Sequence, residues 1–327
     1  MSTNLSAANL EVLAYATEMF NRSGYSTLPP SVDSATSFRS VNSNREYRLV
    51  RIADPSSELA DQFCSLMEES FIPEECDTRE SVAQMIRSVS DPNAFSHAFY
   101  QGVLNDKGQM VAILNWDLLP TGKRSGGRQD GVISIGFIVT TPVERNHRLT
   151  LPLYSAMLRL GVEDAEKRGI DLRLVLAETV STAEGHFQKA LGLRRLYVTL
   201  EGSRPSVRVY HEMEYLQPPL DFTDEGEMAD GAGFVAEHLM LCGFGPEFQT
   251  ISASSLMSAV HGIYKAYAGL SATGNPVRKN EILLQGLDRV HASLMDQEEV
   301  HLISQAVRNE MQEQGILFEE HVEADKD

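Results

Sequence analysis

Cysteine is scarce in this chain. Its 327 residues include three cysteines, Cys64, Cys76 and Cys242, which lie far apart and form no Cys-x-x-Cys pair. Such a small, odd number excludes a disulfide framework, and the spacing is not that of a zinc site built on cysteines. The cysteine usage therefore favours the reducing environment of the cytoplasm.

Long apolar runs and basic charge are also scarce. No run approaches the roughly 20 residues that span a bilayer, and the N-terminus lacks the basic start and continuous apolar stretch of a signal peptide. Lys and Arg number 28 against 46 Asp and Glu, which gives a formal net charge of -18. An acidic chain repels nucleic-acid phosphates and anionic lipid. We therefore expect a cytoplasmic protein with neither nucleic acid nor a membrane as its partner.

Two common catalytic signatures are missing, the Gly-x-Ser-x-Gly nucleophile elbow and the Walker-type phosphate loop. The remaining composition, 42% hydrophobic and 23% charged, is ordinary for a soluble globular protein. The length fits two modest domains. The sequence therefore has to be interpreted from the order of its elements and from local clusters of side chains.

Hydrophobic periodicity predicts a mixed α/β fold for residues 47–217. Before it, residues 5–20 have helical spacing, and a Ser-, Asn- and Pro-rich linker or extended arm completes an N-terminal segment, 1–46. We then expect strands at 47–54, 95–104, 110–118, 131–141, 172–177, 196–200 and 207–215. The helices between them are expected at 57–70, 78–88, 149–168 and 182–191, with Asp77 capping the second and Gly169 ending the third. The strand–helix–strand unit in the middle implies one parallel pair in a largely antiparallel sheet.

A second region is expected after Pro218 and Pro219. Beyond this point strand signals vanish, and helical character marks residues 229–241, 251–270, 277–295 and 298–314. We therefore predict an all-helical C-terminal domain at 218–327, with an acyl-chain tunnel or a subunit interface as its role. The pairs Asp288–His291 and Glu298–His301 each share a helix face, but a metal site needs further carboxylates, and we expect no metal.

The turn between the strand at 131–141 and the helix at 149–168 carries the most informative cluster of charge. It contains Arg145, His147 and Arg148 in an otherwise acidic chain. The first N–H groups of a helix have no partner within the helix, and its dipole is positive there. This combination suits a diphosphate.

Residues 47–215 resemble the GNAT family of N-acyltransferases in element order and in this turn. The family turn follows the pattern Gln/Arg-x-x-Gly-x-Gly/Ala, which aligns Arg145 with the first position and places Arg148 and Thr150 at the glycine positions. The resemblance implies that the turn binds the pyrophosphate of acetyl-CoA or of a longer acyl-CoA. It also implies that backbone groups of the preceding strand pair with the pantetheine arm. The implied binding residues are Ile138, Val139, Thr140, Arg145, Asn146, His147, Arg148, Leu149 and Thr150.

The segment HFQKALGLRR resembles the end of a second family helix, with Phe187, Gly192 and Leu193 in register. The position that often holds an acidic tyrosine is Gln188, which cannot act as a general acid near neutral pH. Acid–base work then falls to other groups. We expect Glu178, at the C-terminal end of its strand, to be the base, and His186 is a second candidate. Capping of a helix or pairing with an arginine is the structural alternative for Glu178.

The resemblance implies direct transfer of an acyl group from acyl-CoA to an amine on a small molecule or a peptide. Two alternatives stay open. The chain is either a non-catalytic GNAT-like assembly module or an acyltransferase whose donor is an acyl carrier protein, held by the basic loop Lys123–Arg128. That loop is otherwise expected to be mobile and solvated. The N-terminal helix on its arm also suggests a homo-oligomer.

Overall fold

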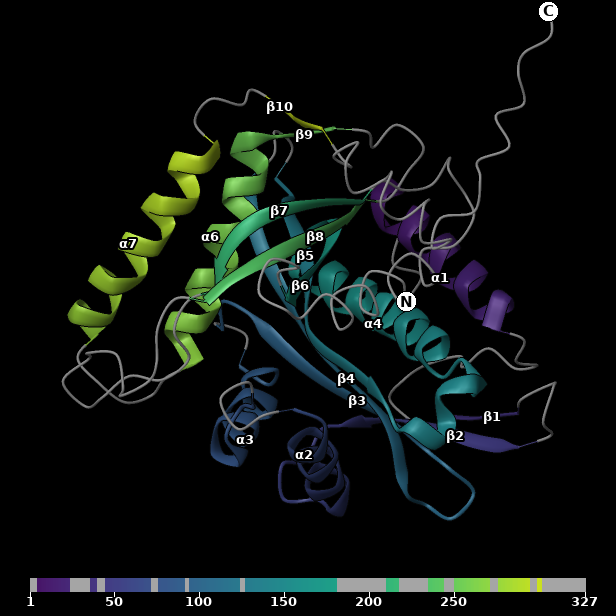
Figure 1. The fold of residues 1–327 in the computed structure, drawn as a ribbon. Coiled ribbons are helices and arrows are strands. Elements are labelled where there is room, and N and C mark those ends of the chain that lie inside the picture. Colours follow the sequence, from purple (N-terminus) through teal and green to yellow (C-terminus); the bar gives the residue numbers. More distant parts are fainter. Residues whose placement is uncertain are drawn as a thin grey trace, which may run out of the picture.

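A computed structural model describes the fold of residues 5–23, 36–39, 45–71, 76–91, 94–123, 127–180, 210–217, 235–243, 250–270, 276–294 and 299–301. Its centre is one eight-stranded sheet with helices on both faces (Figure 1). The strands are β1 (Thr36–Arg39), β2 (Glu46–Ile52), β3 (His97–Leu104), β4 (Met110–Lys123), β5 (Gln129–Thr140), β6 (Ile170–Val180), β7 (Tyr210–Gln217) and β8 (Val235–Gly243). The helices are α1 (Ala7–Ser23), α2 (Glu58–Ser70), α3 (Arg79–Ser88), α4 (Thr150–Arg168), α6 (Ala253–Leu270) and α7 (Pro276–Leu294), with a 3-10 helix, η2, at Pro142–His147.

The strands follow the order β1-β2-β3-β4-β5-β6-β8-β7. Strands β5 and β6 are parallel, and α4 connects them along the chain. The other pairings in this sheet are antiparallel. The predicted class, a mixed and largely antiparallel sheet with flanking helices and one parallel pair, is confirmed for the described residues.

Alternating side chains of the strands divide the core into two layers. Leu114, Trp116 and Leu118 of β4 pack in one hydrophobic cluster with residues of α1 and α4. Ile113 packs in a second cluster with α2 and α3, and Leu119 packs in a third with α6 and α7. Because side chains alternate along a strand, α1 and α4 cover one face of the sheet and the other four helices share the opposite face.

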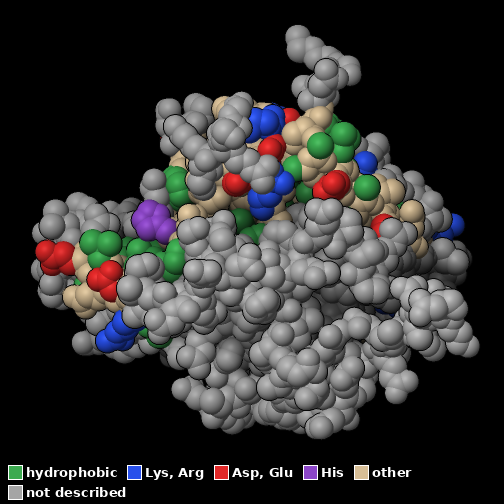
Figure 2. Space-filling view, turned by 90° about the horizontal axis from the view of Figure 1, so that it is seen from above, with side chains coloured by type: hydrophobic (Ala, Val, Ile, Leu, Met, Phe, Trp, Pro, Cys, Tyr) green, Lys and Arg blue, Asp and Glu red, His purple; other side chains and the backbone are tan. Residues whose placement is uncertain are grey.

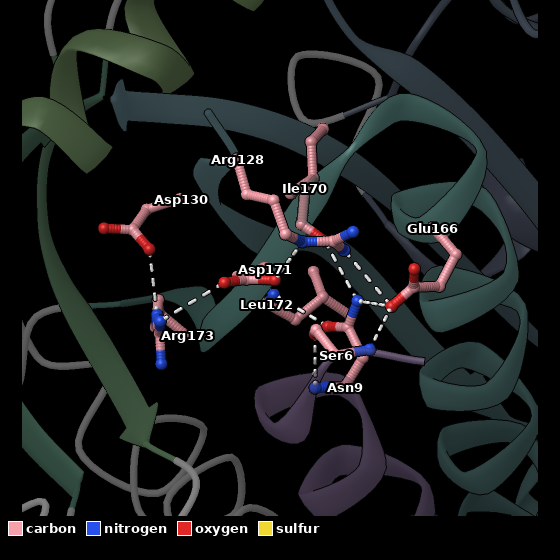
Figure 3. Close-up of polar contacts among 9 residues, drawn as sticks. All are labelled: Ser6, Asn9, Arg128, Asp130, Glu166, Ile170, Asp171, Leu172 and Arg173. Carbon is pink, nitrogen blue, oxygen red and sulfur yellow. Dashed lines mark hydrogen bonds and ion pairs between the residues drawn. The ribbon is translucent and has the colours of Figure 1, made fainter. Parts of the chain in front are cut away.

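Helix α1 is attached to the sheet by buried polar contacts (Figure 3). The side-chain amide of Asn9, with 0% of its surface exposed, donates to Glu166 Oε1 at 2.7 Å and to Ile170 O at 2.9 Å. Its oxygen accepts from Leu172 N at 3.0 Å. Pairing of β6 with β8 begins only at Leu174. Asn9 therefore bonds the first residues of β6 much as a neighbouring strand would, and the predicted N-terminal helix is confirmed.

The structure refines several predicted boundaries. Thr78, not Asp77, caps α3, because its hydroxyl accepts from Ser81 N. Strand β1 lies within the expected linker and pairs with β2. The basic loop is shorter than expected, since β4 continues to Lys123 and pairs there with Gln129. Gly169 ends α4 as predicted, with a left-handed φ of 67° that favours glycine.

The predicted helix at 229–241 is wrong. Residues 235–243 form β8, which lies between β6 and β7 in the main sheet. The helices expected at 251–270 and 277–295 are confirmed as α6 and α7. Residues 250–252 and 299–301 form the short pair β9 (Thr250–Ser252) and β10 (Glu299–His301), so the start of the fourth expected helix is also wrong. The C-terminal segment is thus not all helical, and the predicted division at residue 217 separates two neighbouring strands.

Candidate functional site

A β-bulge at Gly136 shapes the centre of β5. Trp116 of β4 pairs with Ile135, but the preceding residue, Asn115, pairs with Phe137, so Gly136 has no partner of its own. The side-chain oxygen of Asn115 accepts from Phe137 N at 2.8 Å. A Cβ atom at Gly136 would lie 2.4 Å from that oxygen, so the position requires glycine. Bulges bend the strand that carries them.

Strands β5 and β6 part directly after this bulge. Their last paired residues are Ile135 and Ala177. Farther along, Ile138 and Thr140 still pair with β4, while Glu178 and the end of β6 pair with β8. In the described part of the sheet, the edges of β5 and β6 that face each other are therefore unpaired beyond this point. An extended ligand with amide groups can bond to such an edge as an added strand does.

The turn that follows β5 contains a residue in the left-handed conformation that is not glycine. Residues of η2 lead to Arg148, whose φ of 53° and ψ of 35° are left-handed. This conformation is uncommon for residues other than glycine. Neither η2 nor α4 has a side-chain cap at its N-terminus. Leu151 N donates to Arg148 O, and Pro152 has no N–H, so Leu149 and Thr150 are the candidate main-chain donors at this end of α4.

The side chains of this turn fall into two groups. Arg145 and Arg148 are exposed, and Arg145 Nε donates to Thr140 O at 3.4 Å. His147 instead lies 3.6 Å from Glu144 Oε2, next to the ring of Tyr47. Glu144 also accepts from the Tyr47 hydroxyl at 2.7 Å. The two arginines are thus available to a bound anion, while His147 belongs to the contacts that hold the turn in place.

The Tyr47–Glu144 contact is largely buried, and Arg45 completes it. The guanidinium of Arg45 bonds both carboxylate oxygens of Glu144, at 3.0 and 3.1 Å. Burial and the hydrogen bond to Glu144 raise the pKa of Tyr47 to about 12, so the phenol stays protonated and donates. These contacts anchor the turn to β2.

A cavity of about 90 Å³ lies beside the unpaired strand edges, on the shared face of the sheet. We refer to it as the central cavity. Its lining comes from the segment before α3, from α3 and α6, and from strands β4 to β7: Asp77, Met85, Asn115, Asp117, Leu119, Ser134, Ile135, Gly136, Phe137, Glu178, Gln217, Ile263 and Ala266. The bulge and the predicted base therefore share one space.

Glu178 lines the central cavity and is hydrogen-bonded within it. Its Oε2 accepts from Gln217 Nε2 at 2.8 Å, so this contact comes from β7, which β8 separates from β6. The structure describes the backbone of Asn146 but not its side chain, and His186 lies outside the described residues.

Sequence reasoning missed Asp117. Burial, and to a lesser extent the nearby charge of Asp77, raise the pKa of this carboxyl to about 7. Asn115 and Asp117 alternate with Leu114, Trp116 and Leu118 along β4. Two polar residues at positions i and i+2 of an otherwise apolar strand were the available signal, because they face the same side.

Comparisons with known proteins give structural matches only. No family model matches the chain, and no curated protein matches it. A solved GNAT acetyltransferase from Streptococcus pneumoniae is similar at 14% identity and a TM-score of 0.32, over 60% of this chain and 98% of that one. An aminoglycoside 6'-N-acetyltransferase from Acinetobacter baumannii is similar at 13% identity and a TM-score of 0.32, over 48% and 91% of the two chains.

A chimeric spermidine N-acetyltransferase from Vibrio cholerae and hSSAT is similar at 8% identity and a TM-score of 0.33, over 61% of this chain and 95% of that one. At these identities and TM-scores, the matches assign neither a family nor an activity nor a substrate to this chain. No described helix is long and apolar enough to span a bilayer, and the described residues contain no group of three or more side chains suited to hold a metal.

Proposed function

We propose that this protein is an N-acyltransferase that moves an acyl group directly from acyl-CoA to an amine. The observation that carries the proposal is the parting of β5 and β6 after Ile135 and Ala177, next to an uncapped turn with two exposed arginines. Main-chain groups of Ile138, Val139 and Thr140 would bond the pantetheine arm. Arg145, Arg148 and the N–H groups of Leu149 and Thr150 would hold the diphosphate.

The proposed reaction places both substrates at the bulge. The amine nitrogen attacks the thioester carbonyl carbon and forms the C–N bond, while its proton passes to Glu178. The carbon–sulfur bond then breaks, and the CoA thiolate leaves and takes a proton from solvent. Main-chain N–H groups at the open edge of β5 are the available donors for the carbonyl oxygen as its charge develops.

Calorimetric titration with acetyl-CoA and with longer acyl-CoAs tests the donor site. We expect saturable binding that weakens at least tenfold in an Arg145→Ala, Arg148→Ala double variant, because two charge-assisted contacts to phosphate are lost. The matched control is an Arg48→Ala, Arg87→Ala double variant, which removes two exposed arginines elsewhere on the surface. No binding of any acyl-CoA at millimolar ligand would contradict the proposal.

A non-catalytic module is the second candidate, favoured by the loss of both glycines from the turn. Arg145 and Arg148 weigh against it, because both are exposed at the turn and can contact a phosphate. The two candidates differ in one measurement, since the non-catalytic module would not bind acyl-CoA in the titration above.

A carrier-protein donor is less well supported. Arg128 of the expected docking loop is committed to Asp171 at 2.6 Å and to Glu166 at 3.1 Å. On the face of the molecule seen in Figure 2, the described acidic and basic side chains are interspersed rather than gathered by sign. An acidic carrier protein would need a cluster of basic side chains.

A further inference from the structure

The central cavity has an unusual chemical lining. Three carboxyl groups, those of Asp77, Asp117 and Glu178, line it together with the amides of Asn115 and Gln217. No basic side chain is among the described residues that line it. Apolar side chains complete the wall, from α3, α6 and the strands: Met85, Leu119, Phe137, Ile263 and Ala266. The carboxyl groups would repel an anion, and a purely apolar ligand would leave them without a partner, whereas a cation with a short apolar stem can contact both the carboxyl groups and the apolar wall.

Asp117 is a carboxyl group of this cavity without a partner among the described residues. It stands on β4 near the middle of the sheet, is partly exposed and lines the cavity. Among the described residues it makes no hydrogen bond and no ion pair, whereas Glu178 is held by Gln217. A carboxylate deep in a protein is unfavourable unless a cation or hydrogen-bond donors compensate it. No group of the described chain does so.

The size of the cavity limits what can enter. Its volume is about 90 Å³. Since one water-sized group needs about 10 to 15 Å³ of such space, a chain of about six to nine non-hydrogen atoms fills it, whereas a whole sugar or a fused ring does not fit. The apolar wall then contacts methylene groups, and the carboxyl groups contact the charged end.

We propose that the central cavity binds the acceptor as an alkylammonium group, the end of a short unbranched aminoalkyl arm, with Asp117 as its main ionic partner. This inference rests on the proposed function for its biological meaning, because it names the class of amine to which the acyl group is transferred. The cavity adjoins the open edge of β5 through Gly136 and Phe137, so a bound amine lies beside the place proposed for the thioester.

The charge of Asp117 makes the affinity of the central cavity for an alkylammonium ligand depend on pH. The titratable groups that face it from the elements around the cavity are Asp77, Glu178 and Tyr100, and none of them is a cation. The pKa of Asp117 is raised by burial, and then by Asp77, to about 7. An alkylamine with a pKa of about 10.4, like that of lysine, is protonated at both pH 6 and pH 8. Its affinity should therefore be about tenfold lower at pH 6, where about a tenth of Asp117 is ionised.

Ligand-observed NMR titration of the full chain without any CoA tests the site. The probes are n-butylamine and 1-butanol, which have the same number of non-hydrogen atoms and differ in charge. We expect n-butylammonium to bind at least tenfold more tightly than butanol at pH 8, and Asp117→Asn to remove that preference and its pH dependence. The matched control is Asp106→Asn, on the exposed hairpin turn. Asp117→Asn keeps the size of the side chain, and thermal unfolding checks that it folds.

Equal binding of the two probes, or an amine preference that survives in Asp117→Asn, would overturn the inference. The same samples are then titrated with acetyl-CoA, which separates the two proposals. If acetyl-CoA binds and the amine preference is missing, only the acceptor inference fails. If the amine preference holds and acetyl-CoA does not bind, the donor proposal fails and the cation site stands.

Discussion

Replacement of Asn9 by alanine tests how α1 is held to the sheet. The change removes two hydrogen bonds to the main chain of β6 and one to Glu166. Each bond to a neutral group contributes about 1 kcal/mol and the bond to a carboxylate somewhat more, while the buried N–H of Leu172 is left without an acceptor. The higher helix propensity of alanine offsets about 0.5 kcal/mol. We expect the free energy of unfolding to fall by about 3 kcal/mol.

Urea unfolding followed by circular dichroism measures this change. Asn21→Ala is the matched control, because it makes the same substitution at an exposed position of the same helix. The control should change the free energy of unfolding by less than about 0.5 kcal/mol. If Asn9→Ala lies within about 1 kcal/mol of the control, the side-chain amide does not replace a strand at the edge of β6, and the reasoning fails.

Two further predictions concern the cavity and the bulge. Gly136→Ala should lower the free energy of unfolding by about 2 kcal/mol and weaken acyl-CoA binding, because the new methyl group displaces the Asn115 oxygen from Phe137 N. The contrast in a paired urea and calorimetry series is Gly262→Ala, whose new Cβ atom would meet its nearest neighbours at 3.7 Å, an ordinary contact distance. The free energy of unfolding of the Asp117→Asn variant, relative to that of the unchanged protein, should rise by about 2 to 3 kcal/mol as the pH is raised from 5 to 8. The pKa of Asp117 is raised from 3.8 to about 7, so between these pH values the folded state of the unchanged protein holds a proton that the unfolded state has lost. The free energy of unfolding of the unchanged protein therefore falls as the pH rises through this window. Parallel curves of unfolding free energy against pH for the two proteins would refute this sign.

Local signals predicted most of the residues between α1 and β6. Gly169 follows a long amphipathic stretch and takes the left-handed conformation that ends α4, which depends on its neighbours in sequence. Likewise, the β-branched run of β5 and the hairpin turn at Gly108 are determined locally. Such features need no knowledge of the rest of the fold.

Strand β8 and Asp117 could not be predicted in this way. The segment VAEHLMLCG has no clear period, and its strand conformation depends on the open edges of β6 and β7 between which it lies. Asp117 acquires its properties from burial among several elements, including α6, whose Ile263 lies across the cavity. The alternation of Asn115 and Asp117 with apolar residues indicates that the two share a side of the strand, but it does not show that distant segments bury them. The binding turn, by contrast, was visible because its arginines are neighbours in sequence.

The position of β8 has a consequence for dissecting this protein. Because β8 separates β7 from β6, a chain shortened to end at residue 217 would keep β7 but lose the strand to which it is bonded. The same cut would remove α6 and with it one wall of the central cavity. The segment that carries β8 and α6 is thus a structural part of the sheet and of the cavity. The smallest fragment that can keep both extends at least through Leu270.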